Sequence, residues 1–372
     1  MRVKLEEVCK RIYAGGDVPK DRYSEVKTKK YPIPIYANAE KDNGLYGYTD
    51  KAREEELSIT VAARGTIGFT VIRREPFLPV VRLITVVPDT EKVSERYLYY
   101  VLKNCKPQSS GTSIPQLTVP DIKKNRLELY DISEQERIAD QLDKVSKVIE
   151  LRKQELEALD NLIKARFVEM FGTLQDNRNG YDIVTIEEVC SMIKDGTHQT
   201  PIYTEDKENG YKFLSSKDVM TQKIDWTDIK YIPTDLHEKL YATIQPQRND
   251  ILMSKNGVNY GVAAINDTDE VFDIYVSLAL LRPTEVINPV YFRCVINTPD
   301  TKRQFDGSIK GIGVPNLHLG EIKKTKILLP PIQLQGEYVS FVKQVNKSKV
   351  AVQKALDETQ LLFDSLMQEY FG

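Results

Sequence analysis

The sequence has few residues of the kinds that build metal centres and disulfide frameworks. Its 372 residues include only 4 cysteines, 3 histidines and 1 tryptophan. The cysteines form no CxxC pair and the histidines form no cluster; these residues are Cys9, Cys105, Cys190, Cys294, His198, His237 and His318. This spacing suggests neither a disulfide framework nor a zinc site.

Long hydrophobic runs are also missing. The apolar run "VSLALL" at 276–281 is among the longest, and it is far too short to span a bilayer. The first residues, "MRVKLEEVCKRIY", contain no apolar core segment and no small-residue cleavage site of the kind found in secretory signals. We therefore expect a cytoplasmic protein without a membrane partner, long enough for two or three domains.

An excess of positive charge is absent as well. The formal net charge is −2 at pH 7 and the isoelectric point is about 6.1. This balance disfavours a protein that coats nucleic acid through bulk positive charge. Any DNA binding would have to use local patches or a partner that contributes charge.

Catalytic motifs are incomplete or missing. "NPVY" at 288–291 approaches an adenine methyltransferase motif, but Val290 stands where a second proline is needed, so we interpret this segment as a helix start. "PDIKKNRLELY" at 120–130 lacks the lysine that a nuclease needs two residues after Glu128. No phosphate-binding G-x-x-x-x-G-K-[ST] loop is present, and "GIG" at 311–313 lacks a preceding strand. We expect the chain to catalyse nothing by itself and to bind no cofactor or metal.

What the sequence does contain is an internal repeat. Three pairs of segments match in order: "VKLEEVCKRIYAGG" (3–16) with "VTIEEVCSMIKDGT" (184–197), "ITVAARG" (59–65) with "ILMSKNG" (251–257), and "IPQLTVPDIKK" (114–124) with "VPNLHLGEIKK" (314–324). The second copy gains residues only within 198–250 and 298–310. Insertions confined to loops favour a duplicated scaffold whose loops differ in function, with neutral drift of surface loops as the alternative.

Each half divides again by composition. Residues 1–131 and 182–331 contain short alternating runs bounded by turn residues, which predicts two mainly β domains with a few short helices. Residues 132–172 and 332–372 are dominated by helix-forming residues and predict two long helices, with 173–181 as a linker. The expected fold class is α+β.

An apolar stripe at alternating spacings of three and four follows both predicted helices. The stripe residues are Ile138, Leu142, Val145, Ile149, Leu156, Leu159, Ile163, Val342, Val345, Val352, Leu356, Phe363 and Leu366. Such a stripe is typical of a coiled-coil seam. Ser133 and Glu136 are expected to form a capping box at the start of the first helix. Each helix would be about 60 Å long at about 1.5 Å per residue.

The two helices are expected to pair within one chain as an antiparallel coiled coil. A pseudo-two-fold axis would then place the two β-rich domains at opposite ends in equivalent environments. Two alternatives stay open: each helix packs on its own domain, or the helices dimerise between chains.

In this order, the pieces resemble the specificity (S) subunits of type I restriction-modification systems. The residues that carry the resemblance are the paired segments at 114–124 and 314–324, "ISEQERIADQLD" and "RFVEMFG" in the first helix, and "DGTHQTPIYTEDKENGYKFLSSKDV" (195–219). The second helix departs from the pattern, with "PPIQLQGEYV" at its start.

The resemblance implies that 1–131 and 182–331 are target-recognition domains, each binding one half of a bipartite DNA site. The helices would separate the domains and dock two subunits that methylate N6 of adenine. It also implies that S-adenosylmethionine binds those methyltransferases, and that ATP and Mg bind a motor and nuclease subunit. Two rival hypotheses are a scaffold that joins two proteins without reading DNA and a methyltransferase that acts alone.

Candidate DNA contacts are donors and acceptors in the predicted loops of each domain. Base contacts need side chains with donor and acceptor pairs that reach the grooves, while Lys, Arg, Ser and Thr bound to phosphates fix the register. In the first domain the candidates are Lys29, Lys30, Tyr31, Asn38, Arg64, Thr66, Ser110, Thr112, Ser113 and Gln116. In the second they are Lys194, Thr197, His198, Ser216, Lys217, Lys255, Asn256, Asn259, Tyr260, Lys310 and Asn316. Gln116 and Asn316 occupy matched positions and could read adenine, although an amide after proline is also a common turn residue.

Overall fold

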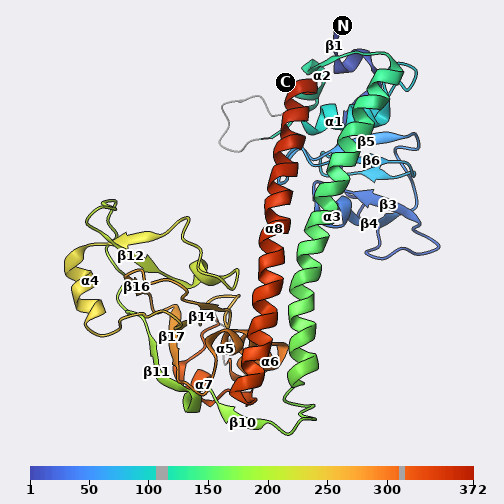
Figure 1. Ribbon diagram of the computed structural model, residues 1–372. Coiled ribbons are helices and arrows are strands. Elements are labelled where there is room, and N and C mark those ends of the chain that lie inside the picture. The colour runs from blue at the N-terminus through green and yellow to red at the C-terminus, as the bar shows by residue number, and fades with distance from the viewer. Residues whose placement is uncertain (106–115, 310–314) are drawn as a thin grey trace. The chain divides into compact units, whose positions relative to one another are not determined.

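Two compact units make up the chain (Figure 1). The computed structural model describes residues 1–105, 116–309 and 315–372. The first unit comprises Met1–Leu156 together with Val352–Gly372, and the second comprises Glu157–Ala351. Each unit therefore holds one β-rich domain and one part of each long helix.

The first unit contains three sheets and two short helices. A four-stranded antiparallel sheet has the order β2-β8-β5-β6, a three-stranded sheet the order β4-β3-β7, and β1 pairs with β9. The strands are β1 (Arg2–Lys4), β2 (Cys9–Ala14), β3 (Ile33–Tyr36), β4 (Leu45–Thr49), β5 (Ser58–Val61), β6 (Thr70–Arg73), β7 (Leu78–Pro79), β8 (Ile84–Pro88) and β9 (Arg126–Glu128). The short helices are α1 (Glu95–Lys103) and α2 (Val119–Lys124).

The second unit repeats this arrangement. Its sheets have the orders β11-β17-β14-β15 and β13-β12-β16, and β10 pairs with β18. The strands are β10 (Asp182–Thr185), β11 (Cys190–Asp195), β12 (Tyr211–Leu214), β13 (Lys230–Ile232), β14 (Ile251–Ser254), β15 (Ala263–Ile265), β16 (Phe272–Ile274), β17 (Leu278–Pro283) and β18 (Lys326–Leu329). The short helices are α4 (Thr234–Tyr241), α5 (Pro289–Ile296), α6 (Pro299–Ser308) and α7 (Leu319–Lys324).

Local details of the two units also correspond. The register of the β2–β8 pair shifts between Cys9 and Arg11, and that of the β11–β17 pair shifts between Cys190 and Met192, at matched positions. Each three-stranded sheet combines one antiparallel and one parallel pair. The internal repeat and the α+β class predicted from the sequence are therefore confirmed.

One short helix in each unit contributes a buried tyrosine whose hydroxyl makes the same hydrogen bond. Tyr97 in α1 is fully buried, and its hydroxyl donates to the carbonyl of Glu128 at 2.8 Å. Tyr291 in α5 makes the same 2.8 Å bond to the carbonyl of Leu328. The side chain of Asn288 accepts from the backbone N–H of Val290 and caps α5, so this segment is a helix start, as predicted.

The long helices are α3 (Ile132–Phe171) and α8 (Ile332–Phe371), and their parts run antiparallel within each unit. In the first unit, the end of α8 lies beside the beginning of α3, where the Tyr370 hydroxyl donates to Gln141 Oε1 at 3.1 Å (Figure 1). In the second unit, Tyr338 donates to the carbonyl of Ile163 at 3.3 Å. The expected antiparallel pairing is confirmed, because α8 enters the core of the first unit although it follows the second domain in sequence.

The stripe residues of both helices lie on the paired faces. Ile138 and Leu142 are fully buried, while Leu159 and Ile163 are half-buried. All thirteen residues of the stripe are buried or half-buried. Lys349, a polar residue on the same stripe, forms an ion pair with Asp160 of α3.

The capping box expected at Ser133 is wrong. Helix α3 begins at Ile132, and Asp131 caps it by accepting from the backbone N–H of Glu134 at 2.9 Å. Ser133 therefore lies inside the first turn. The carboxylate of Glu136 points to the first domain instead, where Ser94 and Arg96 donate to it. In the described ranges, no helix is long and apolar enough to cross a membrane.

Candidate nucleic-acid interface

An exposed basic segment precedes β3 in the first unit. Lys29 and Lys30 are both exposed, in a turn closed by a 3.0 Å bond from the N–H of Tyr31 to the hydroxyl of Thr28. The Lys30 ammonium lies 5.0 Å from the centre of the Tyr31 ring, and a hydrogen bond with this tyrosine raises the pKa of Lys30. Both ammonium groups remain candidates for contact with phosphates.

The loop after β5 meets the segment that leads into α2. The backbone N–H of Leu117 donates to the carbonyl of Ala63 at 2.9 Å. Beside this bond, Arg64 donates from Nε at 3.0 Å and from Nη2 at 2.8 Å to the same amide oxygen of Gln116. Arg64 is exposed and Gln116 is half-buried. The structure thus brings together two candidates that lie 52 residues apart in sequence.

Two neighbouring candidates of the first unit, Asn38 and Thr66, lie beside or within this loop. Asn38 accepts from the N–H of Ala63 at 2.8 Å and donates to the carbonyl of Val81 at 2.5 Å, so its amide holds the backbone in place. Thr66 is exposed near the tip of the loop. The adjacent Gly65 has a φ of +70°, a left-handed conformation that favours glycine.

The second unit has an equivalent junction with different side chains. The loop after β14 pairs with the segment before α7 through an antiparallel bridge between Asn256 and Asn316. The N–H of Leu317 donates to the carbonyl of Lys255 at 2.7 Å, which matches the bond at Leu117. Asn256 and Asn316 therefore occupy the places of Arg64 and Gln116.

Two candidates of the second unit turn inward. Lys255 is 4% exposed, and its ammonium donates to Asp195 Oδ2 at 2.5 Å. Tyr260 is 8% exposed and donates to Asp306 Oδ1 at 2.5 Å. Burial is the main cause of the raised pKa of Tyr260. The expectation that these side chains face DNA does not fit their positions, because their polar groups are engaged within the unit.

A second group of candidates surrounds the turn after β11. His198 is 74% exposed, with Nε2 3.4 Å from Asp195 Oδ2, and Thr197 caps the turn by accepting from the N–H of Gln199 at 3.2 Å. Lys194 is exposed and donates to the carbonyl of Thr243 at 3.1 Å. Of this group, Lys194 and His198 are exposed and Thr197 is half-buried.

Ser216 and Lys217 lie in a short 3-10 turn, Ser216–Val219. The Lys217 ammonium donates to Asp228 Oδ2 at 2.8 Å, and this bond raises the pKa of Lys217. Its charge is thus largely compensated. Asn259 is exposed in the loop after β14. Ser110, Thr112, Ser113 and Lys310 lie outside the described residues.

The sequence analysis missed the residues that join each domain to its long helix. Gln135 is fully buried at the start of α3; it accepts from the N–H of Ser94 at 2.8 Å and donates to the carbonyls of Tyr130 and Lys92. Gln335 of α8 likewise accepts from the N–H of Asn288 at 2.7 Å and is fully buried. The only signal in the sequence was the recurrence of a glutamine at the same place in both helices.

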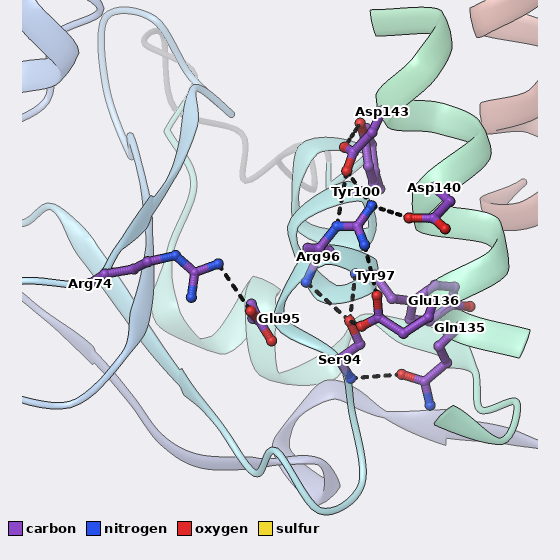
Figure 2. Close-up of polar contacts among 10 residues, drawn as sticks. All are labelled: Arg74, Ser94, Glu95, Arg96, Tyr97, Tyr100, Gln135, Glu136, Asp140 and Asp143. Carbon is purple, nitrogen blue, oxygen red and sulfur yellow. Dashed lines mark hydrogen bonds and ion pairs between the residues drawn. The ribbon is translucent and has the colours of Figure 1, made fainter. Parts of the chain in front are cut away.

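The first unit has a further junction between its domain and α3 (Figure 2). The Arg96 guanidinium in α1 faces three carboxylates of α3, with Nη1 2.8 Å from Glu136, Nη2 2.5 Å from Asp140 and Nε 2.9 Å from Asp143. The hydrogen bond to Asp140 is the main cause of a raised pKa of Arg96. Tyr100 also donates to Asp143, at 2.6 Å. Val290 stands at the equivalent place in α5, so the described residues of the second unit form no such network.

Exposed apolar side chains occur on the long helices of both units. In the first unit these are Ile132, Val148 and Leu151 on α3 and Leu361 and Leu362 on α8. In the second they are Leu162 and Val168 on α3 and Ile332 and Val350 on α8. Leu361 and Val350 are each 69% exposed. Such side chains are candidates for contact with a partner protein.

The comparison with protein families decides the assignment. The sequence model of the type I restriction modification DNA specificity domain matches residues 1–161 and 179–359. The chain belongs to this family. The resemblance drawn from the sequence is confirmed, and the two matched segments correspond to the two halves of the repeat. Type I specificity subunits supply the DNA specificity of a restriction-modification system and not its catalysis.

Relatives carry the same description. Two putative type I specificity subunits of Mycoplasma pneumoniae are 34% identical over 165 and 171 residues. These matches cover 41% and 43% of this chain and 45% and 50% of the relatives, so the matched region spans about half of their length. The MjaIX specificity subunit of Methanocaldococcus jannaschii is 22% identical over 388 residues, covering 95% of this chain and 86% of the relative.

Solved structures of the type I family share the fold. A crystal structure of the S subunit from M. genitalium aligns with a TM-score of 0.54 at 15% identity, covering 100% of this chain and 96% of that chain. A chain from a structure concerning complex assembly and conformational transition of the type I system aligns with a TM-score of 0.58 at 17% identity, covering 100% and 97%.

Proposed function

We propose that the chain selects a bipartite DNA site, with each domain reading one half. The observation that carries the proposal is the equivalent junction in the two units, where Arg64 and Gln116 correspond to Asn256 and Asn316. The backbone scaffold is the same, while the groups that it presents have different hydrogen-bonding chemistry. Two such surfaces on one chain would recognise two different short sequences.

The long helices would dock the methyltransferase subunits. Exposed apolar side chains such as Leu361 and Leu362 support this role, because their burial against a partner would remove apolar surface from water. The methyltransferases would bind S-adenosylmethionine and methylate N6 of adenine, and a motor and nuclease subunit would bind ATP and Mg. The near-neutral charge of this chain fits an assembly in which the methyltransferases complete the DNA clamp.

The first test is a map of N6-methyladenine in the source genome with the gene intact, deleted and restored. We expect one bipartite motif to lose methylation in the deletion strain and to regain it on restoration. If methylation at every motif persists while the neighbouring methyltransferase is active, the chain does not direct methylation, and a scaffold without DNA readout is favoured.

Binding of the assembled complex to duplexes provides a second test. A duplex with the motif should bind more tightly than a scrambled duplex of equal length, and affinity should fall with salt by a slope of about 0.9 per phosphate contact. Lys29→Ala should weaken binding to both duplexes and reduce the salt slope by about one. Equal affinity of the wild-type complex for both duplexes would contradict sequence readout.

A further inference from the structure

Arg64, like Arg53 and Arg73, donates to a neutral oxygen, and in this it differs from Arg11, Arg74 and Arg96 of the first unit. Arg11, Arg74 and Arg96 each donate to a carboxylate, so their charges are compensated nearby. Arg64 donates to the neutral amide oxygen of Gln116 and keeps its full positive charge on an exposed loop. An arginine held in this way is suited to an electron-rich ligand outside the unit.

The geometry of the contact fixes which part of the guanidinium faces outward. Nε–H and one N–H of Nη2 both point to the Gln116 oxygen, at 3.0 and 2.8 Å. The edge formed by Nη1 and Nη2, with its two parallel N–H donors, lies outside this contact. Two parallel donors match the O6 and N7 acceptors of guanine in the major groove. Because Gln116 restrains the side chain beforehand, less conformational entropy is lost on binding.

The loop that carries Arg64 is itself anchored. The Leu117 N–H bonds to the Ala63 carbonyl at 2.9 Å, and the Asn38 amide accepts from the Ala63 N–H at 2.8 Å. These bonds hold the residue directly before Arg64 on both sides. Arg64 therefore projects from a fixed backbone position, which a base contact of defined register requires.

We propose that Arg64, positioned by Gln116, contacts a guanine at one position of the half-site read by the first domain. This inference rests on the proposed function, since it assigns a base to one of the two recognition domains. At the equivalent junction of the second unit, Asn256 replaces the guanidinium by an amide, so that unit makes no such guanine contact at this place.

The test compares variants of the full chain in complex with its methyltransferase subunits. Duplexes that vary each position of both half-sites in turn are selected by binding and sequenced. We expect Arg64→Ala to reduce the preference for guanine at one position of one half-site by about 5- to 150-fold. Preferences in the other half-site should stay unchanged, which also shows that the variant complex is folded.

Three further variants separate readout from charge and from folding. Arg64→Lys keeps the charge but not the two parallel donors, so it should weaken the guanine preference while overall affinity changes little. Gln116→Met removes the acceptor and should weaken the preference at the same position. Gln116→Glu keeps an acceptor but compensates the charge of Arg64, so it should keep the guanine preference and lower the affinity for all duplexes. Lys29→Ala should lower affinity for all duplexes equally.

The outcomes distinguish this inference from the function on which it rests. A wild-type complex without any sequence preference would contradict the proposed function itself. If the wild type selects a bipartite motif and Arg64→Ala retains every base preference, the assignment of Arg64 is overturned. A uniform loss of affinity in Arg64→Ala, as expected for Lys29→Ala, would likewise assign Arg64 to phosphate and refute the guanine contact.

Discussion

Replacing Arg96 by alanine should destabilise the first unit more than replacing any single exposed arginine. The Arg96 side chain is 29% exposed and donates to Glu136, Asp140 and Asp143, which are 40%, 55% and 45% exposed (Figure 2). Without the guanidinium, three carboxylates on one face of α3 would repel each other. A partly exposed network of this kind contributes more than one surface pair, and we expect Arg96→Ala to lose about 2 kcal/mol.

Thermal unfolding of the full chain measures this loss. About 2 kcal/mol corresponds to a decrease of roughly 4–8 °C in the unfolding midpoint of a unit of this size. Arg74→Ala is the matched control, because Arg74 is 61% exposed and forms one ion pair with Glu95 on the same helix α1. The control should change stability by less than about 1 kcal/mol. Equal midpoints for the two variants would refute the reasoning that the network holds α1 on α3.

The effect should also depend on pH. The hydrogen bond from Arg96 lowers the pKa of Asp140 below its ordinary value of 3.8. A carboxylate whose pKa is lowered by folding stabilises the folded state fully when the pH is above its pKa in the unfolded chain. This contribution is lost as the pH falls through its pKa in the folded chain. The difference between wild type and Arg96→Ala should therefore be full at neutral pH and shrink below about pH 4.

Three other substitutions or modifications have defined outcomes. Gln335→Leu should lower the free energy of unfolding, measured with urea, by about 2–4 kcal/mol, because buried backbone groups lose their hydrogen-bond partners. Gln333→Leu, at an exposed position of the same turn, should change this free energy by no more than about 0.5 kcal/mol. Gly196→Ala should destabilise the second unit by roughly 2–4 kcal/mol, since its Cβ would overlap a carbonyl of β16; Gly320→Ala in α7, with open space around it, should be neutral or stabilising in the same assay. Burial raises the pKa of Cys105 to about 12, so alkylation at pH 8 followed by mass spectrometry should find this thiol unmodified in the folded chain and modified after unfolding; modification without unfolding would contradict its burial.

The repeat and the long helices could be predicted from the sequence because both depend on local pattern. The stripe residues Leu142 and Val342, for example, follow a spacing that directly reports the buried face of a helix. The antiparallel pairing followed from the relation between the halves. The exact start of a helix was harder to predict from the sequence, because Asp131 and Ser133 are both good capping residues and only the backbone geometry selects Asp131.

Candidate DNA contacts were less predictable because they depend on pairs distant in sequence. Arg64 and Gln116 were each recognised as suitable donors or acceptors, but nothing local indicated that they meet. Lys255 was grouped with exposed lysines because its partner Asp195 lies 60 residues away. Gln135 was overlooked because a glutamine in the first turn of a helix usually faces water.

The buried glutamines at the start of α3 and α8 form hydrogen bonds with the main chain of their domains. Gln135 bonds to the N–H of Ser94 and to the carbonyls of Lys92 and Tyr130, and Gln335 makes the equivalent bonds within the second unit. These bonds engage peptide groups, so they do not depend on the side chains of Ser94, Lys92 and Tyr130, in contrast to the Arg96 network beside them. Substitutions at Ser94, Lys92 or Tyr130 can therefore leave this part of the joint between domain and helix intact.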